Sequence, residues 1–137
     1  MNIPMITKED AVYMYWDIVN NGDMVTIFCD EALLDSALNA PYVQINGADA
    51  FPTPYLKAAR LGYGLVKNHA FTNGNKRIAV HLMLLCLALY DIYLDYTDDE
   101  MIQFIVNMTQ DKYTIEGIAE WLEQHMRMEV LFHDPTA

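Results

Sequence analysis

A run of nine residues near the middle of the chain holds the side chains best suited to chemistry. Residues 69–77 read His-Ala-Phe-Thr-Asn-Gly-Asn-Lys-Arg. The imidazole of His69 can take a proton from a hydroxyl, because imidazole titrates near neutral pH. Gly74 permits backbone angles closed to other residues, so Gly74 and Asn75 can turn successive N–H groups toward an anion. A base beside an anion site is what a hydroxyl needs to attack a phosphate group.

Two adjacent cations complete this segment. Lys76 supplies a point charge, and Arg77 can bind two phosphate oxygens at once. The chain has a net charge of −11, yet five of its eight Lys and Arg residues lie within residues 57–77, which contain no Asp or Glu. Lys67 is the further cation that we expect near the phosphates, unless it only decorates the surface. The charge pattern predicts one local anion site in an acidic protein.

Each part of the segment also has an ordinary structural explanation. A histidine at a helix end is usually a cap or a packed core residue. A Gly-Asn pair is usually only a turn, and a Lys-Arg pair is usually only solvated. Their combination within nine residues, in a stretch without acidic side chains, favours function over these separate explanations.

The composition predicts one folded domain spanning residues 1–137, with 53% hydrophobic residues to form its core. The acidic balance argues against nucleic acid and anionic membranes as partners, because neutralising many phosphates takes a broad basic surface. The apolar run at residues 78–90 is shorter than the ~20 residues that span a bilayer. Cys29 and Cys86 lack disulfide or metal-site spacing, which favours reduced thiols in the cytoplasm.

Hydrophobic periodicity and capping residues predict an all-α fold of about six helices around one central buried helix. Ahead of the motif, one helix starts at Thr7 and ends near residues 21–22. A second is capped by Asp30 and stops before Pro41, and a third covers residues 53–68.

After the motif, residues 78–90 are expected to form the buried central helix. A capping box at Thr97 starts the next helix, and Thr114 or Asp111 caps the last. Residues 41–54 differ, because alternating residues lead into the tight-turn pair Asn46-Gly47. This pattern predicts a short flap or hairpin before the motif.

The motif His69-x-Phe71-x-x-Gly74-Asn75-Lys76-Arg77 resembles the signature of the Fic/Doc superfamily, His-x-Phe-x-(Asp/Glu)-(Gly/Ala)-Asn-(Gly/Lys)-Arg. Typical Fic proteins have glycine where this chain has Lys76, and a second arginine where it has Val80. Both differences resemble the Doc, or death-on-curing, branch. The resemblance covers essentially the whole chain and implies about six helices.

The resemblance also implies an activity, a nucleotide-dependent transfer to a protein hydroxyl that uses ATP and Mg²⁺. Doc-type toxins pass the γ-phosphate of ATP to a threonine of elongation factor Tu and halt translation, whereas Fic enzymes transfer AMP. Family members that restrain themselves carry (Ser/Thr)-x-x-x-Glu-(Gly/Asn). The nearest match here has Lys112 at its first position, which implies a separate antitoxin in trans.

Residue roles follow from the same resemblance. His69 would be the base that activates the target hydroxyl, and the phosphates would be held by Gly74, Asn75, Lys76 and Arg77. The target's backbone would align by strand-like pairing with a flap formed by Gln44, Ile45, Asn46 and Gly47.

Asn73 departs from the family pattern, which has an Asp or Glu there to hold Mg²⁺. An amide oxygen can ligate a hard cation but brings no charge, so metal affinity should fall. Weakened metal dependence and lost activity are both open. Asn73 makes a non-catalytic nucleotide- or protein-binding module one alternative. AMP transfer to a protein hydroxyl, as in Fic enzymes, is the other.

The other histidines are less informative. His81 lies within the apolar run and is expected to be a packed core residue. His125 and His133 flank an acidic C-terminal region without a convergent partner, and no role is assigned to them.

Overall fold

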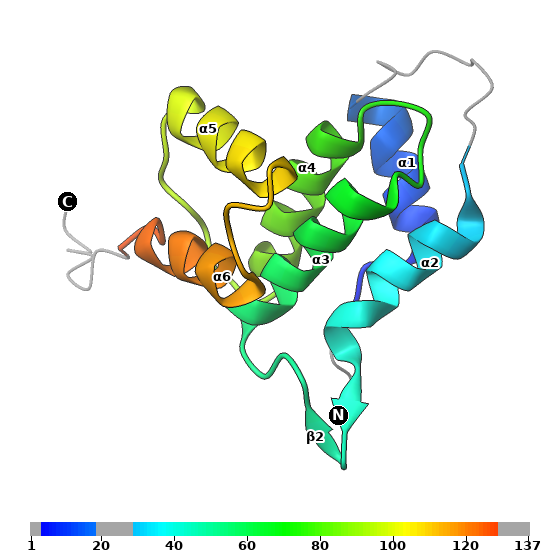
Figure 1. The fold of residues 1–137 in the computed structure, drawn as a ribbon, viewed down its shortest axis with the longest axis horizontal. Coiled ribbons are helices and arrows are strands. Elements are labelled where there is room, and N and C mark those ends of the chain that lie inside the picture. The colour runs from blue at the N-terminus through cyan, green and yellow to red at the C-terminus, as the bar shows by residue number, and fades with distance from the viewer. Residues whose placement is uncertain (1–3, 19–28, 129–137) are drawn as a thin grey trace, which may run out of the picture.

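The computed structural model describes residues 4–18 and 29–128, and it confirms the all-α prediction (Figure 1). Within these residues the helices are α1 (Lys8–Ile18), α2 (Glu31–Asn39), α3 (Pro54–Asn68), α4 (Asn75–Ala88), α5 (Asp98–Thr109) and α6 (Ile115–Gln124), with a 3₁₀ turn η1 at Ala40–Tyr42. Strands β1 (Gln44–Ile45) and β2 (Ala48–Asp49) form the predicted antiparallel hairpin, in which Gln44 pairs with Asp49.

Local capping sets most helix starts where the sequence predicts them. The side chain of Asp30 accepts from the Leu33 N–H, and that of Thr114 accepts from the Gly117 N–H. Thr97 and Glu100 form a complete capping box at the start of α5. These side chains satisfy N–H groups that have no partner inside the helix. The predicted end of the first helix at residues 21–22 lies outside the described residues, and so does His133.

The helix pair α3 and α4 forms the centre of the bundle, whereas the sequence predicts α4 alone. α4 fully buries Ile78, Leu82 and Leu87, but α3 contacts α2, α4, α5 and α6. Small residues explain the position of α3, because a helix with few bulky side chains can approach several neighbours closely. Those buried small residues are Ala58, Ala59, Gly62 and Gly64.

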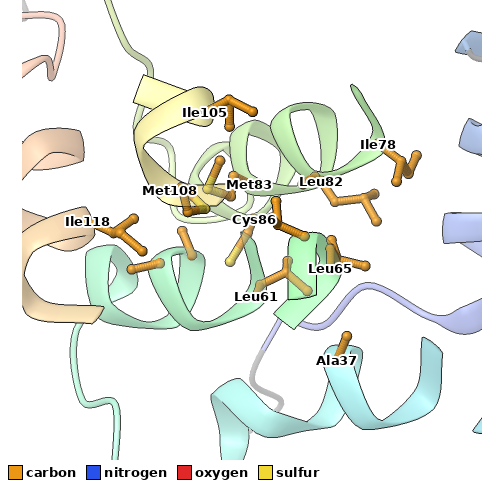
Figure 2. Close-up of a cluster of buried hydrophobic side chains, with 14 of the residues drawn as sticks. Ala37, Leu61, Leu65, Ile78, Leu82, Met83, Cys86, Ile105, Met108 and Ile118 are labelled. Atoms are coloured by element: carbon orange, nitrogen blue, oxygen red, sulfur yellow. The ribbon is translucent and has the colours of Figure 1, made fainter. Parts of the chain in front are cut away.

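The hydrophobic core lies between the helices (Figure 2). Side chains from all six described helices contribute to it, among them Ala37, Leu61, Leu82, Met108 and Ile118. Burial of this apolar surface supplies most of the drive for folding. In the described parts of the chain, no helix combines the length and apolarity needed to cross a membrane.

The hairpin and the loop between α3 and α4 lie at opposite ends of α3 (Figure 1). Lys57, in the first turn of α3, is 4% exposed and anchors the hairpin end. Its ammonium donates to the Phe51 carbonyl oxygen and lies 3.5 Å from the Asp49 carboxylate. A buried cation is thereby paired and used to hold the connection into α3.

His125 has a convergent partner, so the sequence interpretation of this residue is wrong. Its Nε2 lies 3.0 Å from Glu100 Oε2 and its Nδ1 lies 2.7 Å from the Trp121 carbonyl oxygen. The imidazole also stacks on Trp121, with ring centroids 3.8 Å apart. Glu100 precedes His125 by 25 positions in the sequence, and the packing of α5 against the end of α6 brings them together.

We expect Gly62→Ala to destabilise the fold. A Cβ at position 62 would lie 2.2 Å from Met83 Sδ, and Met83 is only 1% exposed. The clash should lower the free energy of unfolding by roughly 1–2 kcal/mol. In a Met83→Ala background the same change should cost little or add stability, because alanine favours helix over glycine. Urea denaturation of the four proteins tests this; equal costs in both backgrounds would contradict the close approach of α3 and α4.

Acid should weaken the contact between α5 and α6. The Thr97 N–H, and then His125, lower the pKa of the Glu100 carboxyl below its usual range. Because the folded pKa is the lower one, this stabilisation is present above the unfolded pKa and is lost as pH falls through the folded value. Glu100→Gln should lower the urea midpoint at pH 7 and lose less stability between pH 5 and pH 3 than the unmodified protein.

Glu120→Gln is the matched control, since Glu120 is exposed on α6 outside this cluster. It should leave the pH dependence of the urea midpoint unchanged. If both variants show the same acid response, Glu100 does not link folding to pH.

Candidate active site

The loop between α3 and α4 is closed by the side chain of Asn75. Its Oδ1 accepts from the Phe71 N–H at 3.1 Å, and its Nδ2 donates to the Phe71 carbonyl oxygen at 2.8 Å. His69 ends α3 with φ 52° and Gly74 precedes α4 with φ 75°, so both lie in the left-handed region. The Asn75 side chain is thus structural, and only its backbone N–H can contribute to the predicted anion nest.

Contacts from the N-terminal part of the chain fix this loop in place. The Phe71 ring stacks on Tyr15 of α1, with centroids 4.0 Å apart and an interplanar angle of 6°. Phe71 also pairs with Cys29 as an isolated antiparallel bridge. The Asp30 N–H donates to the Ala70 carbonyl oxygen at 2.7 Å. The predicted base, His69, and the predicted phosphate-binding residue Gly74 therefore sit on a loop held from several sides.

A pocket of about 550 Å³ brings the predicted residues together. It is lined by Val66, Lys67, His69, Thr72, Asn73, Gly74, Asn75, Lys76, Arg77 and Thr109. The volume lies within the range of small-molecule sites. His69, Lys76 and Arg77 are exposed to solvent, so a ligand can reach the imidazole and both cations from the same side.

The amino end of α4 gives the pocket a positive field. The first N–H groups of a helix lack intrahelical partners, and the N-cap residue Gly74 has no side chain to cover them. Lys76 and Arg77 add two charges in the same turn. Burial, and then the charge of Arg77, lower the pKa of His81 on α4. His81 is half-buried and absent from the pocket lining, and it lies at the edge of the core rather than within it as predicted.

Lys67 lines the pocket but is already bonded. Its ammonium lies 2.8 Å from Asp111 Oδ1 and donates to the Thr109 carbonyl oxygen at 3.1 Å. It thereby ties α3 to the end of α5, and its charge is matched by a carboxylate. Not every cation within residues 57–77 is therefore available to a ligand. Lys57 anchors the hairpin, and Lys67 forms part of the pocket wall.

Asn73 contacts a residue that the sequence does not single out. The Tyr15 hydroxyl lies 2.7 Å from the Asn73 carbonyl oxygen and 3.1 Å from Asn73 Oδ1. Tyr15 and Asn73 are 58 positions apart in the sequence, and no sequence pattern predicts their contact. Among the described residues, no group of three or more His, Cys, Asp or Glu could hold a metal ion. The side-chain oxygen of Asn73 is neutral and already accepts from the Tyr15 hydroxyl, so it is a weaker cation ligand than a carboxylate would be.

The predicted flap does not reach this pocket. Gln44, Ile45, Asn46 and Gly47 form the hairpin at the far end of α3 (Figure 1), and none of them lines the pocket. The fifteen residues of α3 separate the two, a length of about 22 Å at the usual helical rise. The hairpin therefore does not contribute to the His69 pocket, and its alignment of a target stays a prediction.

Comparison with known proteins agrees with the motif. The chain is 46% identical over 50 residues to the protein named Toxin Doc of Mycolicibacterium smegmatis (strain ATCC 700084 / mc(2)155), a match that covers 36% of this chain and 38% of that protein. Less than half of the relative's length is therefore matched. Residues 6–87, more than half of the chain, match the sequence profile of the Fic/DOC family. The chain therefore belongs to the Fic/DOC family, with similarity to a Doc toxin.

Proposed function

We propose that this protein is a Doc-like toxin that transfers the γ-phosphate of ATP to a hydroxyl of a protein target. One observation carries the proposal: a single pocket holds an exposed imidazole, the amino end of a helix and two cations. A base for the hydroxyl and a positive cradle for phosphate are the groups that phosphoryl transfer needs.

The residues act in a defined order. His69 takes the proton of the target hydroxyl while the oxygen of that hydroxyl attacks the γ-phosphorus. The new oxygen–phosphorus bond forms as the bond to the β,γ-bridging oxygen breaks, and ADP leaves. Lys76, Arg77 and the N–H groups at the start of α4 offset the charge on the phosphate oxygens. His69 then gives up its proton to solvent.

The metal would come with the nucleotide. Asn73 Oδ1, which accepts from the Tyr15 hydroxyl, would be the protein's ligand to Mg²⁺, and the other ligands would be phosphate oxygens and water. When bound, the ion neutralises phosphate charge during transfer. This division of ligands predicts a weaker metal requirement than a carboxylate at position 73 would give.

Phosphate transfer is preferred over AMP transfer because of position 80. Where typical Fic proteins have a second arginine, this chain has Val80, which is half-buried against the core. No guanidinium reaches the nucleotide from there. Lys76, in place of glycine, adds a charge nearer the start of α4.

The target and the partner follow from the resemblance to Doc. We propose a threonine of elongation factor Tu as acceptor, an antitoxin protein acting in trans, and the cytoplasm as the place of action. The name Toxin Doc of the mycobacterial relative supports the toxin assignment.

Labelled ATP separates the candidate reactions. Incubation with elongation factor Tu should transfer label from the γ-phosphate and none from the α-phosphate, and His69→Ala should abolish transfer because no base remains. Label from the α-phosphate alone would replace the kinase by nucleotidyl transfer. In cells, expression should arrest growth and His69→Ala should relieve the arrest. Arrest that persists in His69→Ala would favour a non-catalytic binding module.

Binding of ATP should depend on the cation at the start of α4. Lys76→Ala should weaken ATP binding about tenfold, the effect of losing one charge-assisted contact. Lys112→Ala is the control, because Lys112 is equally exposed and does not line the pocket. Isothermal titration calorimetry measures both; equal affinities for the two variants would remove Lys76 from the phosphate site.

A further inference from the structure

Lys67 is held between two acceptors at the end of α5 while it lines the candidate pocket. Its ammonium lies 2.8 Å from Asp111 Oδ1 and donates to the Thr109 carbonyl oxygen at 3.1 Å. The ammonium also lies 5.8 Å from the centre of the Tyr63 ring. An ammonium group has three N–H donors, and these two acceptors engage two of them. Since Lys67 is part of the lining shared with His69, its third N–H can serve a ligand in the pocket.

The backbone that ends α5 places the Asp111 carboxylate beside this ammonium. The Asp111 N–H donates to the Met108 carbonyl oxygen at 3.2 Å. The Lys112 N–H donates to the Asn107 carbonyl oxygen at 3.0 Å. This pair of bonds is a Schellman motif, which needs a left-handed residue at position 111, where φ is 57°. Glycine is the usual residue there because it lacks a Cβ. This chain instead has a carboxylate, which pairs with Lys67.

The Asp111 carboxylate offsets the charge that Lys67 would bring to an anion. Lys76 and Arg77 line the same pocket as Lys67 and are exposed. A phosphate oxygen and a carboxylate oxygen are both anionic acceptors, so they compete for the same ammonium. The Lys67 side chain is 28% exposed and that of Asp111 is 65% exposed. Water screens such a pair and keeps it weak, so a bound phosphate can draw on the charge of Lys67.

We propose that Lys67 is a third phosphate-binding cation of the pocket and that Asp111 limits the affinity for phosphate by competing for its charge. Asp111 is therefore a residue that determines affinity by acting through Lys67. The inference deepens the proposed function, on which it rests for the identity of the ligand, the phosphate chain of ATP.

The first test removes the carboxylate charge and keeps the side-chain shape. Asparagine tolerates a left-handed backbone, so Asp111→Asn keeps the end of α5. Isothermal titration calorimetry at low ionic strength, with pyrophosphate as the probe, should show an affinity about fivefold higher than that of the unmodified protein, the upper range for an exposed ion pair. An unchanged or lower affinity would overturn the proposal, because a pair that only ties α3 to α5 gives no gain when it is broken.

A second background shows whether Asp111 acts through Lys67. Lys67→Met removes the ammonium and keeps an apolar stem of similar length. In this background Asp111→Asn should change the pyrophosphate affinity less than about twofold, because no ammonium remains to be released. Equal gains in both backgrounds would mean that the carboxylate acts on the ligand directly, and would overturn the proposal.

Asp99→Asn is the matched control for net charge. Asp99 is exposed in the first turn of α5, at the opposite end of that helix from Asp111, and does not line the pocket. Its replacement removes the same charge and should change the pyrophosphate affinity less than about twofold. A gain as large as that of Asp111→Asn would assign the effect to total charge and overturn the proposal.

Pyrophosphate binding needs neither phosphate transfer nor a protein target, so the two proposals fail separately. If Asp111→Asn binds pyrophosphate more tightly while no label passes from ATP to elongation factor Tu, the proposed function is refuted and the role of Asp111 stands. If label passes and the pyrophosphate affinity is the same with and without the Asp111 carboxylate, only the role of Asp111 is refuted. Failure of pyrophosphate to bind any of these variants would also overturn that role.

Discussion

The paired hydrogen bonds between the Asn75 side chain and the backbone of Phe71 are the constraint on which the candidate site depends. They close a short loop within the chain, and closure decides where α4 begins. The amino end of α4 then supplies N–H groups to the pocket, with Lys76 and Arg77 in its first turn. Asn75 is 8% exposed, so losing either bond would leave a buried polar group unpaired, which is costly. The side chain of Asn75, which the sequence suggests as part of an anion site, therefore stabilises the fold of the loop.

Some of the cations in this region form structural contacts, and others remain exposed at the pocket. Lys57 is buried against the hairpin connection, and Lys67 is paired with Asp111 at the end of α5. Lys76 and Arg77 remain exposed at the pocket. The helix terminus and these two cations concentrate positive potential locally, and no Asp or Glu among the described residues lines the pocket, so the site can be positive although the chain is acidic.

The secondary structure was largely predictable, because the signals that set it are local. Asp30, Thr97 and Thr114 cap helices where their spacing to apolar residues indicates. Two features were not local and were misjudged. The central place of α3 arises from small residues that admit several neighbours at once. The pairing of His125 with Glu100 arises from packing between helices, and neither residue's sequence neighbourhood signals it.

The sequence by itself determined the order of the candidate site: a histidine, a turn, and then two cations in the first turn of the helix that follows. Such a short segment has few ways to arrange itself, so residue type and spacing suffice. Only the tertiary structure decided which other groups join it. It brought Tyr15 to Asn73, engaged Lys67 with Asp111, and left the hairpin of Gln44 to Asp49 at the other end of α3. These outcomes depend on how whole helices pack, and packing is set by side-chain shape across the core rather than by distance along the chain.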